Sequence, residues 1–369
     1  MCGDKVSALG YGCMRLPQTA AGQIDEEQAV SLFHTAREAG INYFDTAYPY
    51  HDGKGEPFVG QYLSRLPRSS FFAATKMPVW KVNTLDDAEK MFHQQLERLH
   101  TDYIDFYLLH AMNKERFQRA DEIGIFKYLE DEQKKGTIRH FGFSFHDDYE
   151  TFKSLLNYRN WDFCQIQYNY MDRNYQAGDQ GLALTEKLGV PVIIMEPVKG
   201  GSLANLPDSI VAPFRSIHPE ASTASWALRF AAGTENVHLV LSGMSSKDQL
   251  ADNLSVFSHF VPLDAQELEA IEQVKTAIQR CIKNGCTSCK YCMPCPYGVD
   301  IPGNFRIWND WGMYKNITET RKAWRKFTPD TRKAANCHNC GACEKKCPQK
   351  LNIRNDLKSV QREMEELNK

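Results

Sequence analysis

The sequence alternates eight times between a short run of β-forming residues and a longer stretch with helical periodicity, from Val6 to Met244. This order is typical of consecutive βαβ units, which build a parallel sheet. Eight such pairs close a barrel, so the expected fold class is α/β, with a (β/α)8 or TIM barrel. A doubly wound open sheet is the alternative, but no Gly-x-Gly-x-x-Gly fingerprint follows any strand, which disfavours it. The expected strands are residues 6–12, 43–47, 71–76, 103–110, 138–144, 163–169, 190–197 and 237–244.

The cysteines mark a second domain. Nine of the twelve fall between Cys281 and Cys347, after two expected helices at 247–257 and 264–279. We therefore expect a barrel domain over residues 1–279 and a cysteine-rich domain over residues 280–369. In a cytosolic chain of this length, tightly spaced cysteines indicate metal binding rather than disulfides, because cytosolic reductants keep thiols reduced.

Two motifs organise these cysteines. They read Cys286-x2-Cys289-x2-Cys292-x2-Cys295-Pro296 and Cys337-x2-Cys340-x2-Cys343-x3-Cys347-Pro348. The second has the spacing of bacterial two-cluster ferredoxins, and the first is one residue short in its last gap. The pattern favours two 4Fe-4S clusters, with zinc as the alternative. In ferredoxins of this type the cysteine before proline binds the other cluster, which predicts one cluster on Cys286, Cys289, Cys292 and Cys347 and the other on Cys337, Cys340, Cys343 and Cys295.

Two points about this domain stay open at the level of sequence. Cys281 is able to replace a ligand, although a free thiol at the end of the preceding helix is the favoured interpretation. The 41 residues from Pro296 to Asn336 have a helical pattern with an aromatic face, so we expect a small, mainly helical ferredoxin-like domain.

Charge and hydropathy restrict the location and the partners. The longest apolar runs, such as 190–195, are too short to cross a bilayer, and the opening residues lack the pattern of a secretory signal, so we expect a cytoplasmic protein with no membrane contact. Residues 281–369 carry 17 Lys and Arg against 9 Asp and Glu. Two clusters would contribute about −2 each and offset half of this excess, so no nucleic-acid partner is expected.

Polar side chains collect where the expected strands end, which is where barrel enzymes place their chemistry. Reduction of a carbonyl by hydride needs a proton donor, and a tyrosine serves only if a nearby cation stabilises its phenolate. Tyr50 follows strand two, Lys76 ends strand three and His110 ends strand four, so with Asp45 these residues would converge. Each residue taken singly also fits a structural role as a turn cap or a solvated strand end. The strand-end residues are Asp45, Lys76, His110, Ser144, Gln165, Gln167 and Glu196.

Three segments now show a resemblance to a known family. The segments 42–50 (NYFDTAYPY, followed by Glu56 and Gly60), 74–76 (ATK) and 102–110 (DYIDFYLLH) are similar to the signature segments of the aldo-keto reductase superfamily. The resemblance runs from about Lys5 to Phe257. It implies a catalytic tetrad of Asp45, Tyr50, Lys76 and His110, and hydride transfer between a nicotinamide cofactor and a small carbonyl or alcohol substrate.

The same resemblance implies a nicotinamide site. Ser144 and Gln165 would hold the carboxamide, and the segment 12–15 would approach the nicotinamide and ribose. Residues 242–247 would receive a phosphate at a helix start, although a well-capped helix explains them equally. Phe145, Met195 and Gln249 depart from the family pattern, and Gln249 replaces a phosphate-binding Arg, so NADP and NAD both stay open. The expected cofactor-binding residues are Gly12, Met14, Arg15, Asp45, Ser144, Gln165, Gly243, Ser245 and Asn253.

The two domains predict different electron chemistry. A hydride carries two electrons, whereas each cluster exchanges one, and no flavin motif supplies a converter between them. We expect an oxidoreductase whose clusters exchange electrons with a redox partner protein. The alternatives are an electron-transfer protein whose barrel is only a docking or nucleotide-binding scaffold, and clusters that only stabilise the tail.

Overall fold

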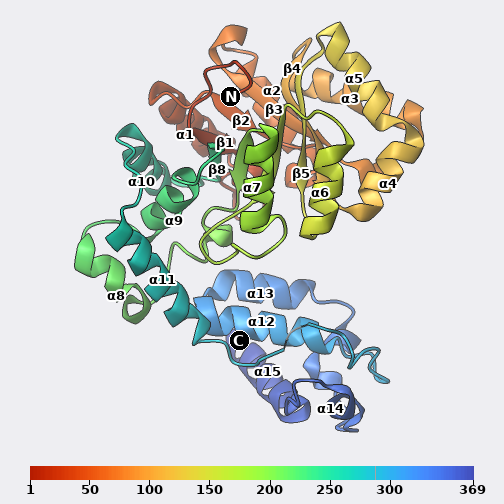
Figure 1. The fold of residues 1–369 in the computed structure, drawn as a ribbon, viewed down its shortest axis with the longest axis vertical. Helices are drawn as coiled ribbons and strands as arrows, with labels where there is room; N and C mark the ends of the chain where they lie inside the picture. Colours follow the sequence, from red (N-terminus) through yellow and green to blue (C-terminus); the bar gives the residue numbers. More distant parts are fainter. Residues whose placement is uncertain (287) are drawn as a thin grey trace. The chain divides into compact units, whose positions relative to one another are not determined.

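The computed structural model describes residues 1–286 and 288–369. Its central element is a closed barrel of eight parallel strands in chain order (Figure 1). The predicted barrel is confirmed, and each expected strand is present with ends shifted by at most a few residues. The strands are β1 (Leu9–Gly12), β2 (Tyr43–Asp45), β3 (Phe72–Met77), β4 (Ile104–Met112), β5 (Ile138–Phe145), β6 (Phe163–Gln167), β7 (Val192–Met195) and β8 (Val237–Ser242).

The helices around the barrel follow from their amphipathic patterns. In α3 the Thr84 side chain accepts a hydrogen bond from the Asp87 N–H while the Asp87 side chain accepts one from Thr84, so a capping box starts the helix. The helix ends at His100, which adopts the left-handed conformation. The helices of the barrel part are α1 (Glu26–Glu38), α2 (Gly55–Leu63), α3 (Leu85–Leu99), α4 (Lys114–Ile123), α5 (Ile125–Lys135), α6 (Tyr149–Tyr158), α7 (Gly178–Leu188), α9 (Thr223–Ala232) and α10 (Lys247–Ser258).

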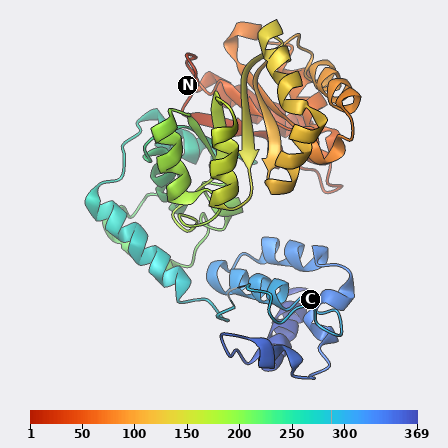
Figure 2. The same cartoon turned by 45° about the vertical axis from the view of Figure 1, so that its right-hand side comes forward.

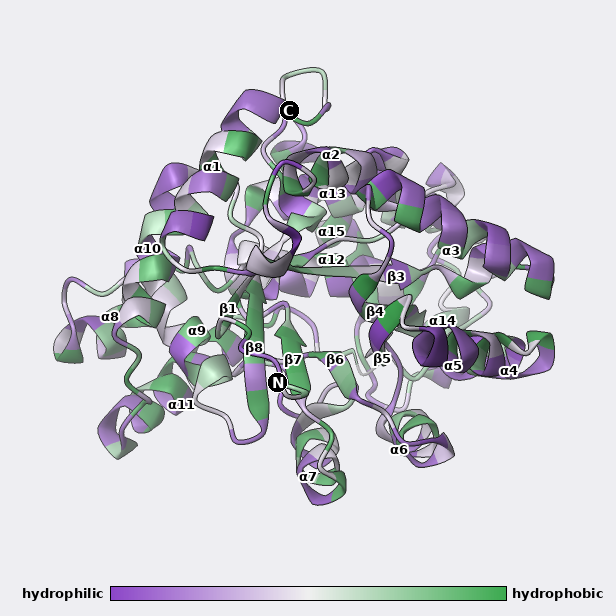
Figure 3. Cartoon of the chain, turned by 90° about the horizontal axis from the view of Figure 1, so that it is seen from above, coloured by the Kyte–Doolittle hydropathy of each residue, from purple (hydrophilic) through white to green (hydrophobic). Residues whose placement is uncertain are grey.

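The barrel interior is apolar, and polar side chains lie at the rim formed by the carboxyl ends of the strands. Tyr43, Phe106, Phe163 and Leu239 belong to one buried cluster inside the strands. Figure 3 shows the hydrophobic colouring of the strands against the mixed colouring of the surrounding helices. This packing fixes the strand register and therefore fixes where the polar strand ends lie.

The chain divides into two compact units, the first made of Met1–Gly200 and Ala224–Asp264 and the second of Gly201–Thr223 and Ala265–Lys369. The second unit is mainly helical, as predicted, and Figure 2 shows its C-terminal helices in blue. Its helices are α8 (Asp208–Ile217), α11 (Ala265–Gln279), α12 (Ile301–Tyr314), α13 (Ile317–Lys326), α14 (Ala342–Lys346) and α15 (Ile353–Leu367). None of the described helices is long and apolar enough to span a membrane.

Candidate active site and cluster sites

Lys76 and Asp45 form a buried ion pair at the rim of the barrel. The Lys76 Nζ lies 2.6 Å from Asp45 Oδ1 and donates a second hydrogen bond of 2.9 Å to the Thr46 carbonyl oxygen. Asp45 ends β2, and Lys76 lies in the neighbouring β3. Burial by itself would lower the pKa of Lys76, but the attraction of Asp45 and Tyr50 outweighs it, and the pKa is raised. Lys76 is therefore held as an ammonium ion.

Tyr50 lies beside this ammonium group in a short 3-10 helix, Tyr50–Gly53. The Lys76 Nζ is 5.3 Å from the centre of the Tyr50 ring. Gly55 lets the chain pass close to Tyr50, since a Cβ at Gly55 would lie 3.0 Å from the Tyr50 carbonyl oxygen and 3.1 Å from its Cβ. Burial raises the pKa of Tyr50, and the charge of Lys76 opposes that rise. The Tyr50 hydroxyl is thus buried away from water, and the neighbouring Lys76 cation favours its phenolate form.

His110 completes the group. Its ring centre lies 5.9 Å from that of Tyr50, with the two planes at 80°. Burial lowers the pKa of His110 well below 6.5, and the charge of Lys76 lowers it further. Its Nδ1 is buried without a hydrogen-bond partner among the described residues. The structure therefore brings Asp45, Tyr50, Lys76 and His110 together, with the imidazole neutral.

A buried polar network lies behind Lys76. Glu56 Oε1 accepts hydrogen bonds of 2.6 Å from both the Thr75 hydroxyl and the Gln95 side chain, and Gln95 also donates to the Lys76 carbonyl oxygen at 3.1 Å. Tyr107 donates to Gln95 Oε1 at 2.6 Å. Because these groups satisfy one another inside the fold, they fix the backbone that carries Lys76. The sequence analysis missed Gln95; its only signal was a polar residue on the apolar face of α3.

The predicted carboxamide residues lie on the next two strands. Ser144 in β5 is buried, and its hydroxyl accepts a hydrogen bond of 2.7 Å from the Ala111 N–H. Gln165 in β6 is also buried, and its Oε1 has no partner among the described residues. A buried acceptor without a donor carries a desolvation cost that a carboxamide N–H would relieve. These residues therefore fit a nicotinamide.

Residues at the end of the first strand pack closely against the end of the eighth strand. A Cβ at Gly12 would lie 3.3 Å from the Ser242 carbonyl oxygen and 3.5 Å from the Gly243 nitrogen. Arg15 packs over Gly243 and lies 3.6 Å from Glu196 of the β7 loop. Met14 is 56% exposed. The predicted residues Gly12, Arg15 and Gly243 thus belong to one part of the rim.

In the segment 242–247, which was expected to bind a phosphate, the hydrogen-bonding groups are engaged by side chains of the protein. Gln249 Oε1 accepts hydrogen bonds from the Ser245 N–H at 2.8 Å and from its hydroxyl at 3.1 Å. Ser246 is the N-cap of α10, and Asn253 donates to the Ser242 hydroxyl at 2.6 Å. The capped-helix interpretation accounts for Ser246. Ser245, Gly243 and Asn253 lie together, but Gln249 takes the amide of Ser245 that a phosphate would need.

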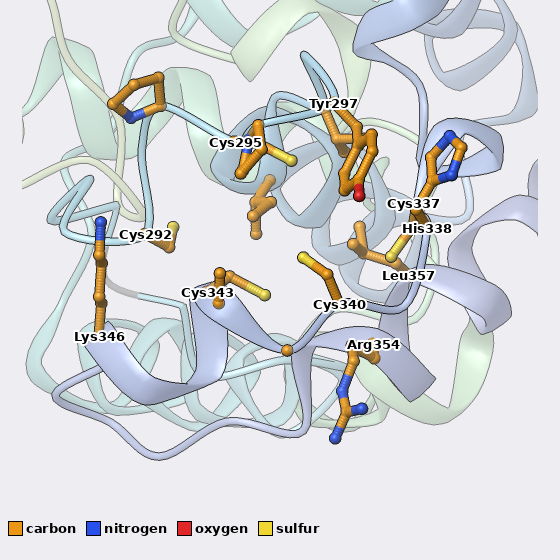
Figure 4. A pocket seen from close by; sticks show the side chains of 16 residues that line it. Cys292, Cys295, Tyr297, Cys337, His338, Cys340, Cys343, Lys346, Arg354 and Leu357 are labelled. Carbon is orange, nitrogen blue, oxygen red and sulfur yellow. The ribbon is translucent and has the colours of Figure 1, made fainter.

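The eight motif cysteines line two cavities. Cys286, Cys289, Cys292 and Cys347 line one, with the apolar side chains of Phe305 and Leu351. Cys295, Cys337, Cys340 and Cys343 line the other, which Cys292 also borders (Figure 4). Across residues 1–286 and 288–369, no three His, Cys, Asp or Glu side chains are grouped closely enough to bind a single metal ion.

The crossed partition expected from the spacing stays a prediction, and the lining of the two cavities is compatible with it. The cysteine that precedes each proline, Cys295 or Cys347, lines the cavity formed by the other motif. Four sulfur donors around a space larger than one ion fit a 4Fe-4S cluster, which thiolates hold. Cys281 lines neither cavity, and its thiol donates to the Ala277 carbonyl oxygen at 3.5 Å.

Comparison with known families agrees with both halves of the chain. The model of the aldo/keto reductase family matches residues 8–276, and that of a 4Fe-4S dicluster domain matches residues 285–351. The chain belongs to the aldo/keto reductase family and carries a 4Fe-4S dicluster domain. The first match includes most of α11, whereas internal contacts group this helix with the second unit, so the boundary at residue 279 stays a prediction.

Individual relatives support the assignment at modest identity. The chain is 28% identical to L-galactose dehydrogenase of Arabidopsis thaliana, over 74% of the chain and 91% of that protein. It is 28% identical to the NADH-specific methylglyoxal reductase of Escherichia coli, over 54% of the chain and 65% of that protein. The holo form of aldo-keto reductase AKR11C1 from Bacillus halodurans matches with a TM-score of 0.61 at 28% identity, covering 73% of this chain and 92% of that one.

Proposed function

We propose that this protein transfers a hydride between a nicotinamide cofactor, NADP or NAD, and a carbonyl or alcohol substrate. The observation that carries the proposal is the buried Lys76 ammonium, which lies between the Asp45 carboxylate and the Tyr50 ring. The bound nicotinamide supplies the hydride.

The side chains of the tetrad have separate roles. Tyr50 donates its phenolic proton to the carbonyl oxygen during reduction and accepts it back during oxidation. Lys76 stabilises the phenolate that forms, and Asp45 keeps Lys76 charged and in place. The neutral His110 orients the substrate oxygen by hydrogen bonding. Ser144 and Gln165 would hold the carboxamide of the nicotinamide, and the buried Gln165 Oε1 is the acceptor available to its amide.

The cysteines support a second part of the proposal. Cys286, Cys289, Cys292 and Cys347 would hold one 4Fe-4S cluster, and Cys295, Cys337, Cys340 and Cys343 the other. Such clusters transfer single electrons, so a redox partner protein would dock at this domain. None of the cysteines that the structure describes forms a disulfide, which is compatible with a cytoplasmic location, where thiols stay reduced.

A matched pair of tyrosine variants tests the reductase activity. Tyr50→Phe in the cluster-containing protein removes only the hydroxyl, and we expect kcat for aldehyde reduction to fall by about 10²- to 10⁴-fold. Nicotinamide binding, followed by fluorescence, should persist. The control is Tyr43→Phe in β2, the strand that precedes Tyr50, which removes a buried hydroxyl that has no hydrogen-bond partner among the described residues.

The control variant should retain its activity, since its hydroxyl contributes no hydrogen bond. Equal activity in Tyr50→Phe and wild type would exclude Tyr50 as the proton donor. If the wild-type protein binds nicotinamide but reduces no aldehyde, the barrel is instead the scaffold of an electron-transfer protein.

A further inference from the structure

Arg116 extends the candidate active site beyond the tetrad. It lies in the first turn of α4, which follows β4, the strand that carries His110. Its NH1 donates a hydrogen bond of 2.5 Å to the carbonyl oxygen of Ala111, the residue directly after His110. The guanidinium also lies 4.3 Å from the ring centre of Trp80, and the Trp80 ring lies 5.1 Å from that of His110. His110, Trp80 and Arg116 thus form a continuous row at the rim.

The charge of Arg116 is not neutralised by a carboxylate. Within the described parts of the chain, no carboxylate forms an ion pair with it, and only one of its guanidinium nitrogens donates a hydrogen bond to the protein. The neighbouring Glu115 is exposed to solvent. A cation in the first turn of a helix is also placed against the helix dipole, so this position costs stability without a binding partner.

Charged groups of both signs lie near Arg116. Glu115 precedes it in the chain, and Asp147 Oδ2 accepts a hydrogen bond of 2.8 Å from the Lys114 N–H. Lys76 is paired with Asp45, which leaves its charge balanced inside the tetrad. His146 follows β5 and contacts the Gln176 side chain through Nδ1 at 3.2 Å, and Glu196 lies 3.6 Å from Arg15. Arg116 therefore carries a positive charge close to His110 that forms no direct ion pair with a carboxylate of the described residues.

The guanidinium is also held in a fixed plane. The Trp80 ring supports its face through a cation–π contact, and the Ala111 carbonyl oxygen anchors one nitrogen. The remaining N–H groups keep the fork geometry that binds a carboxylate through two hydrogen bonds. A fixed fork loses less entropy on binding than a free arginine side chain.

We propose that the carbonyl substrate carries a carboxylate, and that Arg116, supported by Trp80, binds it while His110 and Tyr50 engage the carbonyl oxygen. This inference rests on the proposed reductase function and adds the substrate class to it. Arg116 is a specificity-determining residue in this scheme, and the nearby aromatic ring sets the distance between the carboxylate and the reacting carbon.

The test compares two aldehydes that differ in one charge, 4-carboxybenzaldehyde and its neutral methyl ester. We measure kcat/KM for each with the cluster-containing protein and form the ratio of the acid to the ester. The expected ratio in wild type is about tenfold or more, since hydrogen bonds to charged groups are the strong ones. Arg116→Gln should lower the ratio about tenfold, and Arg116→Lys should restore part of it.

Lys81→Gln is the matched control. Lys81 is an exposed cation adjacent to Trp80. The Lys81→Gln substitution therefore removes one positive charge but leaves the Arg116 guanidinium in place. If the geometry of the Arg116 guanidinium determines the preference, the acid-to-ester ratio of Lys81→Gln should stay within about twofold of the wild-type ratio. If positive charge alone determined it, this variant would also lower the ratio. A wild-type ratio near one, or an unchanged ratio in Arg116→Gln, overturns the inference.

Equilibrium binding separates this inference from the reductase proposal. The quenching of tryptophan fluorescence by each aldehyde, in the presence of oxidised nicotinamide, gives affinities without turnover. If neither aldehyde is reduced, the proposed function fails, while tighter binding of the acid that is lost in Arg116→Gln still supports the anion site. Equal affinities for acid and ester in wild type would disprove the site whatever the activity.

Discussion

Lys76 and His110 show that burial has opposite outcomes for two neighbouring bases. Burial disfavours the charged form of both side chains. Lys76 keeps its proton because Asp45 lies 2.6 Å away, whereas His110 has no carboxylate beside it and is further repelled by Lys76. The site therefore pairs a permanent ammonium ion with a neutral imidazole, and each state follows from the neighbours of the side chain.

The neutral state of His110 predicts a specific pH profile. Because burial and the charge of Lys76 hold its pKa well below 6.5, the group is neutral at pH 6.5 and above. The value of kcat/KM for carbonyl reduction should therefore show no limb with a midpoint near pH 6.5. The measurement is the pH dependence of kcat/KM in wild type, in His110→Gln and in His34→Gln.

His34 is the control because it is an exposed histidine on α1, away from the strand ends. A limb near pH 6.5 that disappears in His110→Gln and persists in His34→Gln would show that His110 titrates during catalysis. That result would contradict the neutral role assigned to it.

At the scale of residues, the sequence predicted the side chains that follow strands and missed those that reach the site from helices. Asp45, Lys76 and His110 were predictable because strands of a barrel end at one rim. Gln95 and Arg116 lie on α3 and α4, where the helical pattern gives the buried face but not the partner across it. Their roles depend on contacts with Lys76 and Trp80 that only the fold brings together.

At the scale of elements, strand positions were predictable and strand ends were less so. Parallel strands covered by helices are apolar on both faces, which gives clear runs in the sequence. The first strand begins at Leu9 and not at Val6, because the Ser7 N–H bonds to the Asn42 side chain instead of a strand partner. The seventh ends at Met195 because Glu196 adopts a left-handed conformation with φ of 58°. Such local exceptions leave no periodic signal.

The fourth strand illustrates the same limit in the site itself. It continues past His110 to Met112, with a shift of register between Leu109 and Met112 and a left-handed Ala111. The bulge turns the Ala111 N–H towards the Ser144 hydroxyl and its carbonyl oxygen towards Arg116. A single irregular residue therefore links the expected carboxamide site with the proposed carboxylate site.

The cysteine elements give a prediction about crossed ligands. Cys347 lines the same cavity as Cys286, Cys289 and Cys292, although it belongs to the second motif. Cys347→Ser should therefore disturb the same cluster signal in the electron paramagnetic resonance spectrum as Cys289→Ser. Cys340→Ser should disturb the other signal. About half of the iron should be lost in each variant if each loses one of two clusters.

Cys281→Ser is the control, because this thiol lines neither cavity and bonds to a helix carbonyl. Its iron content should equal that of wild type. If Cys347→Ser and Cys340→Ser remove the same signal while Cys289→Ser spares it, then each motif holds its own cluster and the crossed partition is wrong.

At the scale of the whole molecule, the two units are stabilised in different ways. The barrel has a closed ring of hydrogen-bonded strands around its own apolar residues. The core of the second unit includes Phe305, Trp308, Leu357 and Val360, and six of the motif cysteines pack against its edge. Whatever fills the two cavities therefore borders the core of α12 and α15 directly. A domain of this size buries a limited core, so its stability depends strongly on such a cofactor.

Removal of iron should consequently unfold the second unit while the barrel stays folded. After anaerobic oxidation and chelation, we expect amide hydrogen exchange in α12 and α15 to speed up by about a hundredfold or more, because cluster binding contributes to folding. Exchange in β3 to β5 should be unchanged, and nicotinamide binding should persist, because Asp45, Lys76 and Ser144 lie on strands with their own core.

Reconstitution with iron and sulfide is the control and should restore slow exchange in α12 and α15. Unchanged protection in these helices after iron loss would show that the apolar core alone maintains them, and faster exchange in β3 to β5 would show that barrel stability also depends on the clusters. If protection in α12 and α15 is unchanged, the clusters do not stabilise the domain. Electron exchange would then be the main reason why the chain keeps eight cysteines at fixed positions.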